Sequence, residues 1–171
     1  MSIIRRRQML LADADTRLIK SIDFSNQKDN EIWYLTTDGQ LYDSVAGLNT
    51  GWGNQTGLEV ISNSYSDGIG KLVCNTDILT AGERWLQTNR KITLISFPRK
   101  FSKLNAFCLQ GEKNLTDVIF LGNIPTFHKN YRPNMFSGSK IHVNIGKLEE
   151  AKQKYSSFNI AQFLEHNFQT I

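Results

Sequence analysis

Ile92-Thr-Leu-Ile-Ser-Phe97 is followed, at intervals of 23 residues, by Leu115-Thr-Asp-Val-Ile-Phe120 and Gly138-Ser-Lys-Ile-His-Val143. Apolar residues recur at fixed positions of these segments and form columns that extend back to Leu72 and Cys74. The first column holds Leu72, Ile95, Val118 and Ile141, and the second holds Cys74, Phe97, Phe120 and Val143. The two columns are two residues apart, which is the spacing along one face of a β-strand. A constant period of this length predicts a stack of structural repeats.

Two shorter columns accompany the first two in the same phase. They hold Ile78, Phe101 and Ile124, and Ala81, Leu104 and Phe127. Each repeat is therefore predicted to be a strand, a turn and an irregular return, and it can bury its apolar face only against its neighbours. Successive strands should pair in parallel, with the Leu72 and Cys74 columns as rungs of the core. The predicted fold class is α/β and β-rich: a short solenoid with a parallel strand ladder over residues 71–145.

The segment before the repeats, residues 26–70, predicts a β-hairpin cap for the first rung. Glu31–Leu35 and Gln40–Tyr42 flank Thr37-Asp38-Gly39, and Asp-Gly between β-forming residues is a strong hairpin signal. A second turn, Ser66-Asp67-Gly68, lies between the expected strands Val60–Ile61 and Lys71–Cys74. Such a cap is needed because an open edge strand exposes hydrogen-bonding groups and apolar side chains.

The segment after the repeats, residues 146–171, predicts a helical cap at the other end. Gly146–Tyr155 is rich in helix formers and has Glu–Lys pairs at spacings of three and four. Ser157–Phe168 has apolar residues at helical spacing and predicts a second short amphipathic helix.

Residues 1–25 are predicted to form an N-terminal arm or helix. Ile4, Leu11 and Leu18 are seven residues apart and could form one apolar face, while Arg5, Arg6 and Arg7 form a basic cluster. The apolar stretch after the arginines is broken by Asp13 and Asp15, so a cleavable signal peptide is not expected. Three alternatives stay open: packing on its own domain, docking to a partner, and disorder. The candidate partner-binding residues of this arm are Ile4, Arg5, Arg6, Arg7, Leu11 and Leu18.

Trp52 is the remaining candidate partner-binding residue. It lies in Ala46–Gly57, which contains four glycines and several small polar residues and is expected to be a loop. A tryptophan on such a loop can be exposed, so Trp52 is a possible contact point for a glycan or a protein.

The composition sets the class of protein. The chain has 171 residues, 40% of them hydrophobic and 21% charged, which fits one folded domain with a sizeable core. A net charge of +4 is too small to predict a nucleic-acid partner. Two cysteines form no disulfide framework, and no apolar run approaches the roughly 20 residues of a membrane span. A soluble protein stabilised by packing is expected.

No catalytic, cofactor or metal site is predicted. The three histidines, His128, His142 and His166, have no second ligand at metal-site spacing. Alternation places His142 on the face opposite the core, where we expect a solvated imidazole with no acid placed to orient it. The carboxylate pairs Asp13 with Asp15 and Glu149 with Glu150 are expected to be solvated. Cys74 and Cys108 are expected to be buried, inert thiols. The chain is therefore predicted not to be an enzyme.

Several of these segments resemble BspA-type leucine-rich repeats. The resemblance covers about residues 30–158: Asn30–Gly39 and Val60–Leu72 are similar to the lead-in of that family, Asn114–Leu121 and Ile92–Pro98 to its repeat opening, and Ala81–Leu86 to its turn. Ser139–Asn144 and the following helix resemble its closing strand and cap. The second repeat is shorter, the third has an insertion around His128–Pro133, and Cys74 replaces an aliphatic residue.

The resemblance implies a non-enzymatic role in adhesion or recognition, on the surface of gut anaerobes or in phages that infect them. The start Met-Ser-Ile-Ile-Arg-Arg-Arg looks like the starts of phage appendage proteins, so we expect a virion component, a head or tail fibre or appendage. The alternative is a glycan- or protein-binding adhesion module, in the bacterial cytoplasm or at the cell surface by a non-classical route. Expected partners are other virion or surface proteins and a second copy, with a dimer favoured, and no nucleic acid or membrane span.

Overall fold

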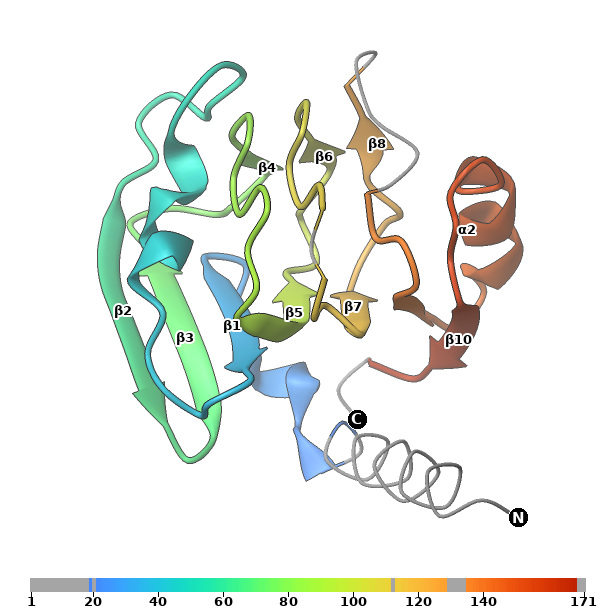
Figure 1. The fold of residues 1–171 in the computed structure, drawn as a ribbon, viewed down its shortest axis with the longest axis horizontal. Helices are drawn as coiled ribbons and strands as arrows, with labels where there is room; N and C mark the ends of the chain where they lie inside the picture. Colours follow the sequence, from blue (N-terminus) through green and yellow to red (C-terminus); the bar gives the residue numbers. More distant parts are fainter. Residues whose placement is uncertain (1–18, 20, 112, 129–134, 169–171) are drawn as a thin grey trace.

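The computed structural model describes residues 19, 21–111, 113–128 and 135–168, and they form a β-rich fold with two sheets (Figure 1). The larger sheet has seven strands in the order β10-β9-β7-β5-β1-β3-β2, and the smaller has three in the order β4-β6-β8. The strands are β1 (Glu31–Thr36), β2 (Val60–Ser66), β3 (Ile69–Cys74), β4 (Thr80–Ala81), β5 (Ile92–Phe97), β6 (Lys103–Leu104), β7 (Asp117–Phe120), β8 (Thr126–Phe127), β9 (Lys140–Asn144) and β10 (Gln162–His166). The helices are the 3-10 segments η1 (Phe24–Asn26) and η2 (Asp43–Asn49), and α2 (Leu148–Lys154).

The predicted repeats form a β-solenoid of about three turns. β5, β7 and β9 pair in parallel, with Ile95 opposite Val118 and Val118 opposite Ile141. The second column is in register too, since Phe97 lies opposite Phe120 and Phe120 opposite Val143. The fourth column forms the small sheet, in which Ala81, Leu104 and Phe127 are partners in turn. The 23-residue period is therefore confirmed as the repeat of a parallel stack.

The first rung departs from the prediction, because β1 lies between β3 and β5. β1 is antiparallel to both, so that Leu72 faces Ile32, and Tyr34 faces Ile95. Leu72 and Cys74 are buried in the same core as the later rungs, but the expected direct pairing of Leu72 with Ile95 is wrong. The reason is that β1 is apolar on both faces and fits only inside the sheet. The sheet is consequently mixed rather than parallel throughout.

The N-terminal hairpin was also predicted in the wrong place. Gln40–Tyr42 is not a strand, and the chain continues into η2, while β1 takes its partners from β3 and β5. The second predicted turn is confirmed: Asp67 and Gly68, both with positive φ, connect β2 and β3 in an antiparallel hairpin. The segment before the repeats therefore caps the solenoid with β1, β2 and β3.

At the other end, α2 confirms the first predicted helix, but the second is wrong. Ser157–Phe168 contains the strand β10, which pairs in parallel with β9 so that Phe163 lies opposite Ile141. The outer edge of β9 has backbone groups that need partners, and β10 supplies them. A short apolar run fits helix and strand patterns equally well, so periodicity alone could not decide this element.

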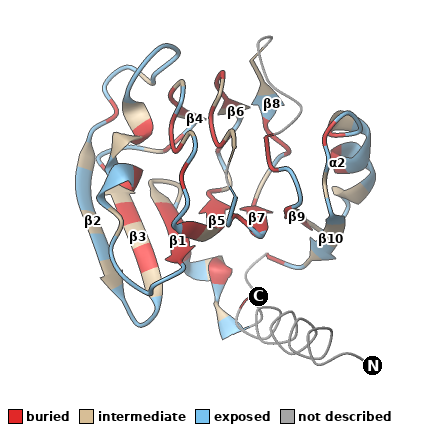
Figure 2. Cartoon of the chain, in the orientation of Figure 1, coloured by how far each residue is buried: buried red, intermediate tan, exposed pale blue. Residues whose placement is uncertain are grey.

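Buried residues concentrate in β1, β5, β7 and β9, whereas β2 and β10 have intermediate and exposed residues (Figure 2). The main core lies inside the solenoid and contains stacked aromatic rings, with 5.4 Å between the ring centroids of Phe97 and Phe120. A second cluster contains Ile19, Phe24, Trp33, Leu35, Leu94, Ile119, Leu121 and Phe168. Because Ile119 and Val118 are successive residues of β7, the second cluster lies on the opposite face of the sheet.

Arg99 ties both ends of the described chain to this second face. Its guanidinium donates hydrogen bonds to the carbonyl oxygens of Gln27 (2.8 Å), Ser25 (3.2 Å) and Phe168 (3.1 Å). Gln27 is itself buried and exchanges side-chain and backbone hydrogen bonds with Ser96 of β5. The segment around η1 is therefore part of the folded domain. This places the two ends of the described chain on the same side of the sheet.

Candidate functional site

A cleft of about 760 Å³ lies beside the three-stranded sheet, where the loop after η2 meets the turns after β4 and β6. We call it the Trp52 cleft; its lining is Gly51, Trp52, Gly53, Glu83, Arg84, Lys103, Asn105, Ala106, Phe107 and His128. Trp52 is 84% exposed, although a tryptophan on a protein surface is usually largely covered. The exposure expected for Trp52 is thus confirmed, and the structure adds the cleft next to it.

Backbone contacts hold the Trp52 loop, residues 50–59, and the end of η2 before it on the turn after β4. The Gly82 N–H donates to Leu48 O (2.8 Å), and the Glu83 N–H donates to Trp52 O (3.1 Å). A Cβ at Gly82 would lie 2.0 Å from Thr50 O, so only glycine allows this approach. The tryptophan is therefore mounted on a backbone fixed on either side of it.

Asn105 fixes the other side of the same loop. Its side chain is buried, and its amide nitrogen donates to Gly53 O (2.6 Å) and to Ala81 O (2.8 Å). The first of these bonds joins the loop to β6, and the second joins two solenoid turns. Gly53 has φ +71°, and a Cβ there would meet the Asn105 amide at 2.5 Å. The sequence Gly51-Trp-Gly53 is thus required by the geometry of the cleft wall.

Charged side chains line the rest of the cleft. Arg84 is exposed, pairs with Glu83 at 3.5 Å and lies over the ring of Phe107 at 5.6 Å from its centroid. Lys103 is half-buried on β6 between Thr80 and Thr126 of the neighbouring strands. The lining therefore combines an exposed aromatic ring, two cations and one carboxylate. Such a surface can hold a small polar ligand by stacking and hydrogen bonding.

His142 corrects one expectation about the chemistry. It lies on the face opposite the main core, as predicted, but it is buried, because the second cluster covers that face. Its Nε2 is 2.7 Å from Asp117 Oδ1, and its Nδ1 is 2.9 Å from His166 Nε2. An acid does orient this imidazole, contrary to the expectation. Burial by itself would raise the pKa of Asp117, but the hydrogen bonds from His142 and Thr116 hold that pKa below its usual value.

The arrangement of Asp117, His142 and His166 joins three neighbouring strands, β7, β9 and β10. Ser139, the residue directly before β9, is buried, and its hydroxyl donates a hydrogen bond to Leu115 O (2.7 Å). Among the described residues, no group of three or more His, Cys, Asp or Glu side chains is arranged so that it could hold a metal ion. We therefore interpret this cluster as a polar connection within the sheet.

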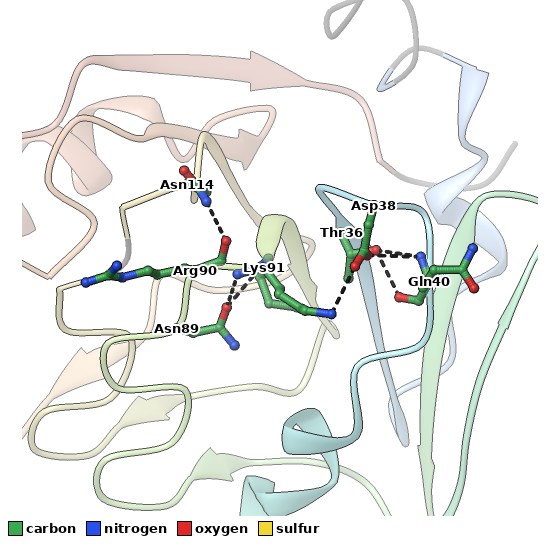
Figure 3. A network of polar contacts seen from close by, with 8 residues as sticks. Thr36, Asp38, Gln40, Asn89, Arg90, Lys91 and Asn114 are labelled. Carbon is green, nitrogen blue, oxygen red and sulfur yellow. Dashed lines mark hydrogen bonds and ion pairs between the residues drawn. The ribbon is translucent and has the colours of Figure 1, made fainter.

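A second polar network connects β1 to the entry of the repeats (Figure 3). Asp38, in the turn after β1, pairs with Lys91 at 2.9 Å, and this contact lowers the pKa of Asp38 and raises that of Lys91. Asn89 accepts hydrogen bonds from the backbone N–H groups of Lys91 (2.6 Å) and Ile92 (3.0 Å). Asn114, one repeat later, donates to Arg90 O. These contacts align the start of β5 with the turn after β1.

The other candidate residues divide into three groups. Cys74 and Cys108 are buried and form no disulfide, as expected, and burial raises the pKa of Cys74 to about 11. Glu149 and Glu150 are exposed and pair with lysines of α2 and its N-terminus, as expected of solvated carboxylates. The predicted arm residues Ile4, Arg5, Arg6, Arg7, Leu11 and Leu18, and the pair Asp13 and Asp15, lie outside the described residues.

Sequence reasoning did not find the cleft residues Glu83, Arg84, Lys103, Asn105 and His128 or the role of Asp117. The 23-residue period offered one signal: Arg84 and Phe107 occupy equivalent positions of successive turns, both with positive φ.

No helix of the described residues has the length and hydropathy needed to cross a membrane. No family model, curated protein or solved structure matches this chain.

Proposed function

We propose that this chain is a non-enzymatic binding protein that recognises its partner through the Trp52 cleft and works as a component of a bacteriophage virion, in a head or tail fibre or appendage. The observation that carries the binding role is the 84% exposure of Trp52 on a loop that backbone contacts and Asn105 hold in place. A large aromatic ring left in water gives nothing to the stability of the fold, whereas a fixed ring binds a ligand with little loss of entropy.

The virion role and the assignment to BspA-type leucine-rich repeats rest on the residue patterns given above. A β-solenoid of about three turns is compatible with that assignment, because such repeats stack strands and leave loops free on one side for recognition. The basic residues Arg5, Arg6 and Arg7 would serve the attachment of the chain to a neighbouring subunit. Fold alone does not decide this role.

Adhesion outside a virion is the second candidate function, and the Trp52 cleft favours it to the same degree. In that case the chain acts at a bacterial surface or on a host glycan or protein. The two candidates share the cleft and differ in where the chain is found. They are therefore separated by location, and both are tested by the cleft.

The cleft is tested by binding of the labelled full chain to bacterial envelopes. Trp52→Ala should reduce binding at least tenfold, since the platform is lost while nothing in the core changes. Ile145→Ala is the matched control, because Ile145 is 63% exposed and is not part of the cleft lining. Equal binding by the Trp52→Ala chain and the unaltered chain would refute recognition through this cleft.

The virion role is tested by mass spectrometry of purified particles from a culture that produces this chain. The chain should copurify with particles through a density gradient. It should leave the particles only under conditions that also release other structural proteins. A full-length chain with Arg5→Glu, Arg6→Glu and Arg7→Glu should be depleted from particles while keeping its unfolding midpoint. If the unaltered chain is absent from the particles but still binds envelopes, adhesion outside a virion is favoured.

A further inference from the structure

We infer that the ligand of the Trp52 cleft is an acidic saccharide, whose sugar ring stacks on Trp52 and whose carboxylate, sulfate or phosphate group binds Lys103 and Arg84. This inference rests on the proposed function and adds the class of ligand.

The size and rim of the cleft fit one or a few sugar rings. Its volume of about 760 Å³ is in the range of sites for small ligands. The exposed indole offers a flat apolar surface and one N–H donor, which suits a pyranose ring with an apolar face and hydroxyls at its edge. Glu83 lies in the same lining and accepts hydrogen bonds from hydroxyl groups.

The charge of the cleft favours an anionic group on that sugar. Among the described residues, Lys100 pairs with Asp29 and Asp77, and Lys91 pairs with Asp38, whereas no described carboxylate pairs with Lys103. Lys103 is nevertheless half-buried in the wall of the cleft. An ammonium group beside a cleft and without a partner carboxylate can bind an anion brought by a ligand.

Arg84 adds a second cation at the rim. Its pairing with Glu83 is long, at 3.5 Å, and its side chain is 68% exposed, so its planar fork can turn to a bidentate anion. The ring of Phe107 beneath it limits the directions that the guanidinium can take. Lys103 and Arg84 lie in different solenoid turns, so an anion between them would bridge two repeats.

Single-stranded nucleic acid also combines aromatic rings with phosphates, but the cleft fits it less well. Glu83 would lie against the repeated phosphates, and the lining presents one strongly exposed tryptophan rather than a row of stacking platforms. The net charge of the chain, +4, is also low for such a partner. An oligonucleotide is therefore kept as a competing outcome of the test.

The test uses the fluorescence of the full-length chain. Of its three tryptophans, Trp33 and Trp85 are buried and only Trp52 is exposed, so a ligand on the cleft should change the emission and iodide quenching of Trp52. The probes are trigalacturonate, a sulfated disaccharide, a phosphorylated monosaccharide and the neutral galactotriose, with a dT oligonucleotide for comparison. We expect at least one acidic probe to bind at least tenfold more tightly than galactotriose, and the three acidic probes distinguish carboxylate, sulfate and phosphate.

Variants separate the roles of the ring and the cation. Lys103→Gln should reduce the affinity for the preferred acidic probe about tenfold and leave that for galactotriose unchanged. Trp52→Ala removes the fluorescent reporter, so binding by this variant is measured by isothermal titration calorimetry, and it should be lost for both probes. Lys152→Gln, on the exposed face of α2, is the matched control and should change neither. Raising the salt concentration should weaken only the acidic probe.

The outcomes distinguish this inference from the proposed function. Equal affinities for acidic and neutral probes, tighter binding of the oligonucleotide, or no binding of any saccharide would overturn the acidic saccharide. If Trp52→Ala still reduces envelope binding at least tenfold in those cases, the proposed function stands with another ligand. If it does not, the proposed function falls as well.

Discussion

The repeating strands β5, β7 and β9 and the antiparallel strands β1, β2 and β3 belong to one sheet but are stabilised in different ways. In the repeats, equivalent side chains stack on one another from turn to turn, as Phe97 does on Phe120. In the antiparallel part, the contacts occur once: Tyr34 lies over Gly70, where a Cβ would come within 2.3 Å of its ring, and its hydroxyl donates to Asn63 (2.8 Å). Repeated contacts are visible as a sequence period, whereas single contacts leave no pattern.

The largest effect is expected in the repeating part, from Phe120→Ala. The ring of Phe120 packs between Phe97, Phe136 and Tyr155, so its removal opens a cavity that all three rings share. We expect a loss of about 3–5 kcal/mol in the free energy of unfolding, measured by urea denaturation. Phe120→Leu should lose much less, because most of the buried volume is kept. A loss below about 1 kcal/mol for Phe120→Ala would contradict the stacked core.

A smaller effect is expected in the antiparallel part, from Gly70→Ala. The added methyl group has no space beneath Tyr34, and overpacking of this kind costs about 1–3 kcal/mol. Gly47→Ala is the matched control, since its nearest atom would be Thr50 Oγ1 at 3.8 Å. Thermal unfolding should show a lower Tm for Gly70→Ala than for Gly47→Ala. The reverse order would mean that Tyr34 does not rest on Gly70.

The closing end of the repeats carries a pH dependence. Asp117 has a lowered pKa in the folded chain, so its stabilising effect is complete above its unfolded pKa of about 3.9 and is lost as the pH falls through the folded value. Asp117→Asn should lower the free energy of unfolding at pH 7 by about 1–2 kcal/mol and reduce the decrease of stability on the acid side. Asp38→Asn removes an exposed carboxylate, so it should change the free energy of unfolding less, both at pH 7 and on the acid side. An unchanged acid transition in Asp117→Asn would contradict this assignment.

The sequence was sufficient for the elements that repeat or follow local rules. The 23-residue columns identified the strands β5, β7 and β9 and their register, the Asp67-Gly68 turn identified the β2–β3 hairpin, and helix-forming residues identified α2. Each of these depends on interactions between near neighbours or between equivalent positions. They could therefore be inferred without knowing the rest of the fold.

The errors concern pairings between distant segments. Nothing near Glu31–Thr36 indicates that β1 inserts between β3 and β5, and nothing near Gln162–His166 indicates that β9 leaves an edge for β10. His142 was assigned to the correct face but to solvent, because the residues that bury it come from the two ends of the described chain. For the candidate site, Trp52 was found from its loop, whereas Lys103 and Asn105 join it only through the stacking of the turns.

The smallest expected effect concerns positive φ angles that recur at equivalent positions of successive turns of the repeats, whereas in the antiparallel part the positive φ angles of Asp67 and Gly68 belong to a single hairpin turn. Arg84, Leu86 and Thr88 have positive φ in one turn, and Phe107, Leu109 and Gly111 have it at the equivalent positions of the next. Thr88, with φ 58°, is exposed and β-branched, which makes this conformation costly, and its counterpart Gly111 is already a glycine. Thr88→Gly should therefore stabilise the chain by about 1 kcal/mol and raise Tm by about 2–4 °C. Thr126→Gly, at an exposed threonine of β8 without positive φ, should instead lower Tm, because glycine weakens an ordinary strand position. If both substitutions lower Tm to the same extent, the turns of the solenoid carry no strain at Thr88, and the equivalence of Thr88 and Gly111 is one of position only.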